Sequence, residues 1–407
     1  MKASHAPIPR LRSYTGAAIL GYGFRPFFLA SALAAALGLI VWLAILAGTL
    51  SLPTAFTPLI WHAHEMLVGF AVAAVAGFLL TAIPNWTGAL PLQGQPLLWL
   101  VMLWLAGRLA VALSGIIGAG LAAAIDLAFL GALAFVVGRE VVAGKNWRNL
   151  PMLAALLALL IANLLMHAEP LGLASSAATG WRLGIAVVTL LIVLIGGRIV
   201  PSFTRNWLAK RGDPALPAPA DRFDQVAIGA TLMALVVWIV FPGSGLAAVL
   251  LALAAGLNVV RLGRWRGQRT LADPLVFVLH VGYAWVAAGL ALLAAAQTGF
   301  AAGAPLLEEN AAIHGLTAGA FGTMTLAVMT RATLGHTGRA LHVGTGTTLV
   351  YLLVSVAAVA RIATAAWSDA YDALLWTATV AWIGAFAGFL VIYGPMLVRP
   401  RPDGKAG

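Results

Sequence analysis

A cluster of ionisable and metal-ligating side chains stands at the start of a long apolar segment. The string WHAHEM, residues 61–66, is followed by apolar and small residues to about Pro84. Ionisable groups at the border of a membrane span are costly, and those that persist there usually bind an ion, a proton or a cofactor. A regular helix turns by about 100° per residue, so His62 and His64 point to nearly opposite sides. They can share one metal only if His62 lies before the first helical turn; otherwise each ring has its own partner.

The chain contains no cysteine. This excludes thiolate metal sites, iron–sulfur clusters and disulfides. Any transition metal must therefore be held by histidine, methionine or carboxylate. Met66, one turn beyond His62, adds a thioether to the same segment.

The composition predicts which elements position these groups. Of the residues, 62% are hydrophobic and only 9% are charged, whereas soluble domains carry about 25% charged residues. We therefore expect an all-α fold, a polytopic membrane helical bundle with about 12 transmembrane helices. The expected helices run at 26–49, 61–84, 96–114, 117–138, 151–168, 181–201, 225–242, 245–261, 274–297, 311–331, 345–367 and 371–397.

The distribution of charge predicts the topology. Residues 1–25 lack a cleavage site of small residues, so we expect a cytoplasmic N-terminus and no signal peptide. All of the 24 Lys and Arg then fall on the cytoplasmic side except Arg108, Arg182 and Arg361. This positive-inside pattern supports twelve helices with both termini in the cytoplasm. The net charge of +11 follows from topology, so we expect the lipid bilayer and no nucleic acid as a partner.

The longest polar stretch, residues 202–224, divides the helices into two six-helix sets at about 26–201 and 225–397. A cytoplasmic loop between two sets is typical of secondary transporters built from repeated halves. The two halves share no clear sequence similarity, however. We therefore expect a single integral membrane domain over residues 1–407.

This topology brings four histidines to about one depth near the external face. His62 and His64 begin the second expected helix, His167 ends the fifth beside Met166, and His314 begins the tenth. A lone histidine at that depth is usually interfacial or hydrogen-bonded. Four of them, with methionines nearby, favour a metal or haem site.

A second group of candidates lies toward the cytoplasmic side. Arg25, Arg198 and Arg331 stand at expected helix boundaries, where each is either a topology anchor or a clamp for haem propionates or another anion. His280 is expected inside the hydrocarbon. Its ring is either hydrogen-bonded to a neighbouring helix or an axial ligand, and the residues leave both open.

Four strings of the sequence together resemble the NnrS family, membrane proteins associated with the bacterial response to nitric oxide. The strings are GYGFRPFFLASAL, WHAHEMLVGFAVAAVAGFLLTAIPNWTG, GGRIVPSFTRNW and HGLTAGAFGTMTLAVMTRATLGHTGR. The resemblance covers most of the chain. It implies a multi-pass protein of the bacterial inner membrane that contains haem and copper and protects against nitrosative stress.

This resemblance also directs attention to particular residues. The expected metal ligands are His62, His64, His167, His314 and Met66. The expected cofactor-binding residues are His280, His336, Arg25, Arg198, Arg331 and Asn206. The carboxylates expected to orient the ligand rings are Glu65, Glu169 and Glu309.

Two functions of different classes account for these features. The first is a haem–copper membrane protein that binds nitric oxide or performs redox chemistry on nitrosylated small molecules. Whether it turns over as an enzyme, and what its electron donor is, stay open. The alternative is a secondary transporter for a small anion, a metal or an iron–nitrosyl species. A purified protein with the Soret band of haem would favour the first function, and a colourless one the second.

Overall fold

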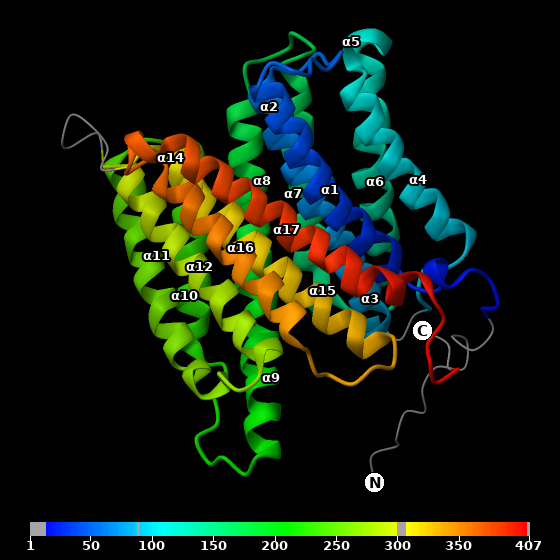
Figure 1. Cartoon of the computed structure of the whole chain (residues 1–407), viewed down its shortest axis with the longest axis vertical. Helices are drawn as coiled ribbons and strands as arrows, with labels where there is room; N and C mark the ends of the chain where they lie inside the picture. The colour runs from blue at the N-terminus through cyan, green and yellow to red at the C-terminus, as the bar shows by residue number, and fades with distance from the viewer. Residues whose placement is uncertain (1–13, 88–89, 299–306, 405–407) are drawn as a thin grey trace. The chain divides into compact units, whose positions relative to one another are not determined.

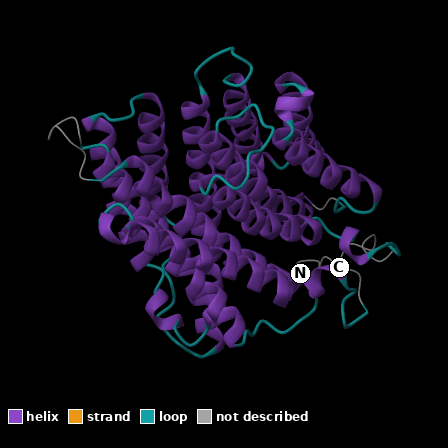
Figure 2. Ribbon diagram, turned by 45° about the horizontal axis from the view of Figure 1, so that its top comes forward, coloured by secondary structure: helices purple, strands orange, loops and turns teal. Residues whose placement is uncertain are grey.

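The computed structural model describes residues 14–87, 90–298 and 307–404, and their regular structure is entirely helical (Figure 1). Figure 2 shows these helices joined by loops, without a strand in the described residues. Within the described residues, 12 helices are long and apolar enough to cross a membrane. The predicted all-α, polytopic fold is thereby confirmed. The expected cytoplasmic ends of the chain include residues 1–13 and 405–407, which lie outside the described residues.

The helices follow the expected order along the chain. The elements of the first six spans are α1 (Phe24–Leu46), α2 (Pro58–His64), α3 (Val72–Thr87), α4 (Gln95–Ala112), α6 (Ala119–Ala143), α7 (Leu150–Ala168), α8 (Ala177–Leu191) and α9 (Gly197–Lys210). The elements of the last six are α10 (Arg222–Val240), α11 (Gly245–Gly263), α12 (Pro274–Ala296), α14 (Glu309–His314), α15 (Gly322–His336), α16 (Thr345–Ala363) and α17 (Tyr371–Val398). A one-turn helix, α5 (Ser114–Ile117), fills the break expected between the third and fourth spans.

Local sequence signals set several helix starts. Proline suits the first turn of a helix, where its missing N–H costs nothing, and α2 begins at Pro58. At α10, the Asp221 side chain accepts from the backbone of the first turn while Asp224 reaches back to the Asp221 N–H, a reciprocal capping box. Because α2 begins at Pro58, both His62 and His64 lie inside a helix and point to different sides.

Among the described residues, three spans are interrupted by π-helical turns. These turns are Glu65–Ala71 between α2 and α3, Ile192–Gly196 between α8 and α9, and Gly315–Phe321 between α14 and α15. A π turn widens the helix and is frequent at functional sites. The first turn follows His64 directly and the third follows His314 directly.

The chain forms two compact units. The first consists of Met1–Gly180, Ala332–Ala340 and Leu390–Gly407, and the second of Trp181–Arg331 and Leu341–Phe389. The segment 202–224, expected as a loop between the two six-helix sets, belongs to the second unit, and its first part is helical because α9 continues to Lys210.

Each unit is held together by close helix packing. In the first, α1 packs along α3, and α6 packs against both α4 and α7. In the second, α11 packs against both α10 and α12, and α12 also packs against the π turn Gly315–Phe321. Small residues permit this approach, as is common between membrane helices. A Cβ atom added at Gly315 would lie 2.9 Å from the Gly289 Cα atom of α12.

Candidate metal centre

Four helices of the first unit meet at a buried polar cluster. His64 ends α2, Arg108 comes from α4, Asp126 from α6, and Asn163 and His167 from α7. The side chains of His64, Asp126, Asn163 and His167 are buried. Buried polar groups must satisfy one another, because water is excluded.

The Asp126 carboxylate is the hub of this cluster. Its Oδ2 atom accepts from Asn163 Nδ2 at 2.8 Å and from His167 Nε2 at 2.9 Å, and lies 3.1 Å from His64 Nε2. Its Oδ1 atom accepts from the Arg108 guanidinium. His64 Nε2 also donates to Asn163 Oδ1 at 2.8 Å. One carboxylate thus ties three other helices to α6.

Glu65 and Arg108 complete the cluster on the other side of His64. Glu65 Oε1 lies 3.0 Å from His64 Nδ1 and accepts from Arg108 Nη1 at 2.6 Å. The Arg108 guanidinium therefore bridges two carboxylates, Glu65 and Asp126. A histidine that ligates a metal usually gives its other ring N–H to a carboxylate or carbonyl. Glu65 stands in that relation to His64.

Two glycines make room for these groups. A Cβ atom at Gly107 would lie 2.7 Å from Asp126 Oδ1, and one at Gly69 would lie 3.1 Å from Glu65 Oε2. Gly107 precedes Arg108 on α4, and Gly69 lies within the π turn Glu65–Ala71. Only glycine lets the two carboxylates approach their neighbouring backbones this closely.

Aromatic side chains cover the two imidazoles. The Phe56 ring lies 5.3 Å from the His64 ring and 5.1 Å, edge-on, from the His167 ring. Phe56 in turn belongs to an apolar cluster with Trp61 and Val111. The two imidazole rings are 5.4 Å apart and nearly perpendicular. The arrangement keeps the ring nitrogens away from water.

The donor set of His64, Asp126 and His167 suits a transition metal. One ligand atom from each of these residues lies within 4.8 Å of the other two. Two imidazoles and a carboxylate are suitable ligands for copper, zinc, iron or nickel. In addition, His167 Nδ1 is buried and lacks a hydrogen-bond partner among the described residues. A buried nitrogen without a hydrogen-bond partner, beside groups that are hydrogen-bonded, indicates that the site can bind a further ligand.

His62, one of the predicted ligands, points away from this cluster. Its ring stacks on Trp42 of α1 at 4.5 Å between centroids. Met66 lies on the same side of the span, since a Cβ atom at Gly38 of α1 would touch the Met66 methyl group at 2.6 Å. His62 and His64 therefore have different partners.

His314 and Glu309 belong to the second unit. Glu309 accepts from Arg182 Nη2 at 2.7 Å and from Trp238 Nε1 at 2.8 Å. His314 Nδ1 donates to the Asn310 carbonyl oxygen at 2.6 Å, within α14. This bond orients the imidazole, as a ligand ring is usually oriented.

The predicted arginines have varied surroundings. Arg25 is fully buried, and its Nη1 donates to the carbonyls of Met396, Leu397 and Arg399 at 3.3, 2.9 and 2.9 Å. It thus satisfies carbonyls at the end of α17, where a helix lacks its own donors. Arg331 lies over the Phe203 ring at 4.0 Å. Arg198 and Asn206 are exposed on α9.

The remaining predicted residues have protein partners. His280 is buried, with Nε2 2.8 Å from the Thr204 hydroxyl of α9, which is the hydrogen-bonded alternative of the sequence analysis. His336 stacks on Tyr22 at 5.8 Å. Glu169 accepts from the Ala177 backbone N–H at 3.2 Å, near the start of α8.

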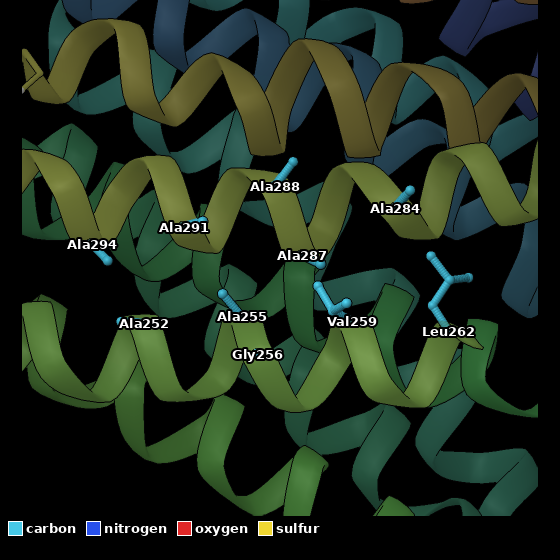
Figure 3. Close-up of a pocket in the computed structure, with 10 residues that line it drawn as sticks. All are labelled: Ala252, Ala255, Gly256, Val259, Leu262, Ala284, Ala287, Ala288, Ala291 and Ala294. Carbon is cyan, nitrogen blue, oxygen red and sulfur yellow. The ribbon is translucent and has the colours of Figure 1, made fainter. Parts of the chain in front are cut away.

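The structure provides a pocket for haem less clearly than it provides a site for a metal ion. The small residues of the π turn Gly315–Phe321 pack directly against α12, since a Cβ atom at Gly319 would lie 2.6 Å from the Trp285 ring. A groove of about 460 Å³ between α11 and α12 is lined by apolar residues such as Ala255 and Ala287 (Figure 3). A second cavity of about 430 Å³, beside Pro84 and Glu140, also lacks a histidine. Neither cavity offers a haem an axial imidazole.

Sequence reasoning missed three members of the cluster: Arg108, Asp126 and Asn163. The signal was present, because Arg108 was an exception to the charge pattern and Asp126 is an acid inside an apolar helix. Ionisable residues within a span pair with one another and mark functional sites. Searching for the partner of Arg108 would have identified Asp126.

Comparison with known proteins agrees with the resemblance noted in the sequence. A sequence model described as NnrS protein matches residues 18–401. No curated protein matches the chain.

Proposed function

The chain belongs to the NnrS family, and from this premise we propose that it protects the cell against nitrosative stress as a haem- and copper-binding protein of the bacterial inner membrane. Family membership itself suggests a role in the nitric oxide response. The buried His64–Asp126–His167 triangle is the observation that carries the copper part of the proposal. Its donors are the types that copper accepts in a chain without cysteine.

The chain's own residues perform definite tasks in this proposal. Glu65 lies beside Nδ1 of His64, so that Nε2 faces the triangle. To ligate a metal, His64 would give up the Nε2 proton that Asn163 Oδ1 accepts in the structure and keep the Nδ1 proton toward Glu65. Asp126 supplies an anionic oxygen, and Arg108 holds both carboxylates in place. Phe56 covers the imidazoles and excludes water. Bound copper would supply an open coordination position for a small ligand and one-electron chemistry.

The haem part of the proposal depends on the family and not on a cavity. His314 is the first candidate for an axial ligand, because the Asn310 carbonyl orients its ring. His62 and His336 are the other candidates, since both rings stack on aromatic side chains.

The test combines metal content with protection in cells. A host without its own nitric oxide defence would express the chain or a variant and grow with a compound that releases nitric oxide. The wild type should protect the host and should be purified with copper and a Soret band. His167→Ala should lose copper and protection, and His342→Ala, at an exposed histidine, should keep both. Full protection by a His64→Ala, His167→Ala double variant would refute the proposal.

A transporter is the second candidate, and one observation favours it. The described first unit holds the buried Asp126 and the partly buried Glu65 and Arg108 within its spans, and ionisable groups inside spans often line ion pathways. A transporter would be colourless and copper-free as purified. It would move a small anion or a metal ion across proteoliposome membranes, with loss of transport in Asp126→Asn.

A further inference from the structure

The charges around the triangle limit the metal ion that it can hold. Two carboxylates, Glu65 and Asp126, both pair with the single guanidinium of Arg108. The exposed fraction of their side chains is 12% for Glu65, 0% for Asp126 and 9% for Arg108. With neutral imidazoles as ligands, these three groups carry a net charge of −1.

Other charged side chains on the same helices have partners of their own. Arg139 and Glu140, toward the end of α6, pair with each other at 2.8 Å. Glu169, just after α7, accepts from the Ala177 backbone N–H. The charge count at the triangle is therefore set by Arg108, Glu65 and Asp126.

A net charge buried in a membrane span is costly. A monovalent cation at the triangle would bring the cluster to zero, whereas a divalent cation would leave it at +1. Among the metals that imidazole and carboxylate ligands suit, copper is the one with a common monovalent ion. Alkali cations prefer oxygen ligands, and two of the three donors here are nitrogens.

Arg108 is held in place to exert this effect. Its guanidinium touches both carboxylates, and the Gly69 and Gly107 positions provide the space for these contacts. A Cβ atom at Gly69 would also lie 3.4 Å from Arg108 Cδ. The positive charge of the Arg108 guanidinium thus has a fixed position beside the metal ligands, although Arg108 is not itself a ligand.

We propose that the His64–Asp126–His167 site selects monovalent over divalent metal, taking Cu(I) in preference to Zn(II), and that Arg108 is the residue that sets this selectivity. The inference rests on the proposed function, since it deepens the copper site described there. Arg108 acts as a positioning and charge-compensating residue.

The test uses two variants that change the cluster charge in opposite directions. Arg108→Gln removes a positive charge, and Glu65→Gln removes a negative charge while keeping an oxygen acceptor for His64 Nδ1. The purified full-length protein would be titrated anaerobically with Cu(I) against a chromophoric chelator, and separately with Zn(II). The measured quantity is the ratio of the Zn(II) to the Cu(I) dissociation constant. Arg108→Lys, which keeps the charge, is the matched control.

The expected shifts have opposite signs. One unit charge about 5–6 Å from the ion, at an effective dielectric constant near 20, changes the ratio on the order of 100-fold. Arg108→Gln should lower the ratio by that order, toward Zn(II), and Glu65→Gln should raise it. The ratio for Arg108→Lys should stay within about tenfold of the wild-type ratio, because lysine keeps the positive charge. Some change is expected, since its compact ammonium replaces only part of the bridging geometry.

Each result has a definite meaning. Shifts of the ratio in opposite directions support the proposal, and Glu65→Gln alone still tests it if Arg108→Gln fails to fold. Equal weakening of both metals in the variants would assign a merely structural role to Arg108 and overturn the proposal. In that case, the proposed function would still stand if His64→Ala and His167→Ala each lose their bound copper. If copper binding does not depend on His64 and His167, the proposed function and this inference both fail.

Discussion

The substitution Asp126→Asn tests whether one carboxylate organises the buried cluster. In the folded chain, Oδ1 accepts from Arg108, while Oδ2 accepts from Asn163 and His167 and lies beside His64 Nε2. Asparagine has nearly the same shape as aspartate. The variant therefore removes the charge and one acceptor oxygen without creating a cavity.

The expected loss of stability follows from the charged and polar groups that stay buried in the variant. Removing one partner of a buried ion pair typically costs about 3–5 kcal/mol, because the other charge is left uncompensated. Here the Arg108 guanidinium keeps Glu65 but loses Asp126. In addition, the new amide N–H₂ must face at least one donor, an arrangement that costs about 1–3 kcal/mol when buried. We expect the free energy of unfolding to fall by roughly 3–5 kcal/mol, with partial relief from reorientation of Arg108.

Thermal or denaturant unfolding in detergent, followed by the fluorescence of the 14 tryptophans, would measure this loss. Glu140→Gln is the matched control, because Glu140 lies on the same helix and pairs with the exposed Arg139. The control should change the free energy of unfolding by no more than about 1 kcal/mol. If Asp126→Asn is as stable as Glu140→Gln, the carboxylate is not the hub that the contacts indicate.

Three further predictions concern other parts of the structure. Arg261→Gln breaks a buried ion pair with Asp224 in the second unit and should cost about 3–5 kcal/mol of unfolding free energy, measured by the same unfolding assay. Gly107→Ala should cost about 1–3 kcal/mol and weaken copper binding in a chelator titration, since its Cβ atom would lie 2.7 Å from Asp126 Oδ1; a neutral effect on both would contradict the packing. The hydrogen bond from the Arg264 guanidinium lowers the pKa of Asp221 from 3.8 to about 2. The ionised Asp221 should therefore stabilise the folded chain above about pH 4, and this stabilisation should disappear as the pH falls through about 2. The difference in melting temperature between wild type and Asp221→Asn should vanish over that range.

The fold was largely predictable because a membrane imposes strict rules on a sequence. Backbone groups in lipid must pair within the same segment, so long apolar segments become helices. The twelve expected helices therefore appear, but the sixth, expected at 181–201, continues to Lys210 through part of the expected loop. The π turns at Glu65–Ala71 and Gly315–Phe321 were not predictable, because a widened turn leaves no change in hydropathy.

The candidate site was predictable only in part. Residue type and depth singled out His64, His167 and Glu65, which the structure brings together in the buried cluster. Asp126 and Asn163 were missed, because helix rotation decides which single polar residue of an apolar helix faces the neighbouring helices. The separation of His62 from His64 depended on the helix start at Pro58, and sequence analysis left that start open.

X-ray absorption at the copper edge tests the central claim most directly. Copper-loaded wild-type protein should show a shell of only nitrogen and oxygen neighbours at about 2 Å, with the multiple-scattering pattern of two imidazoles. The His64→Ala, His167→Ala double variant should lose this spectrum, and His342→Ala should keep it. A sulfur neighbour from Met66, or an unchanged spectrum in the double variant, would contradict a copper site at His64, Asp126 and His167.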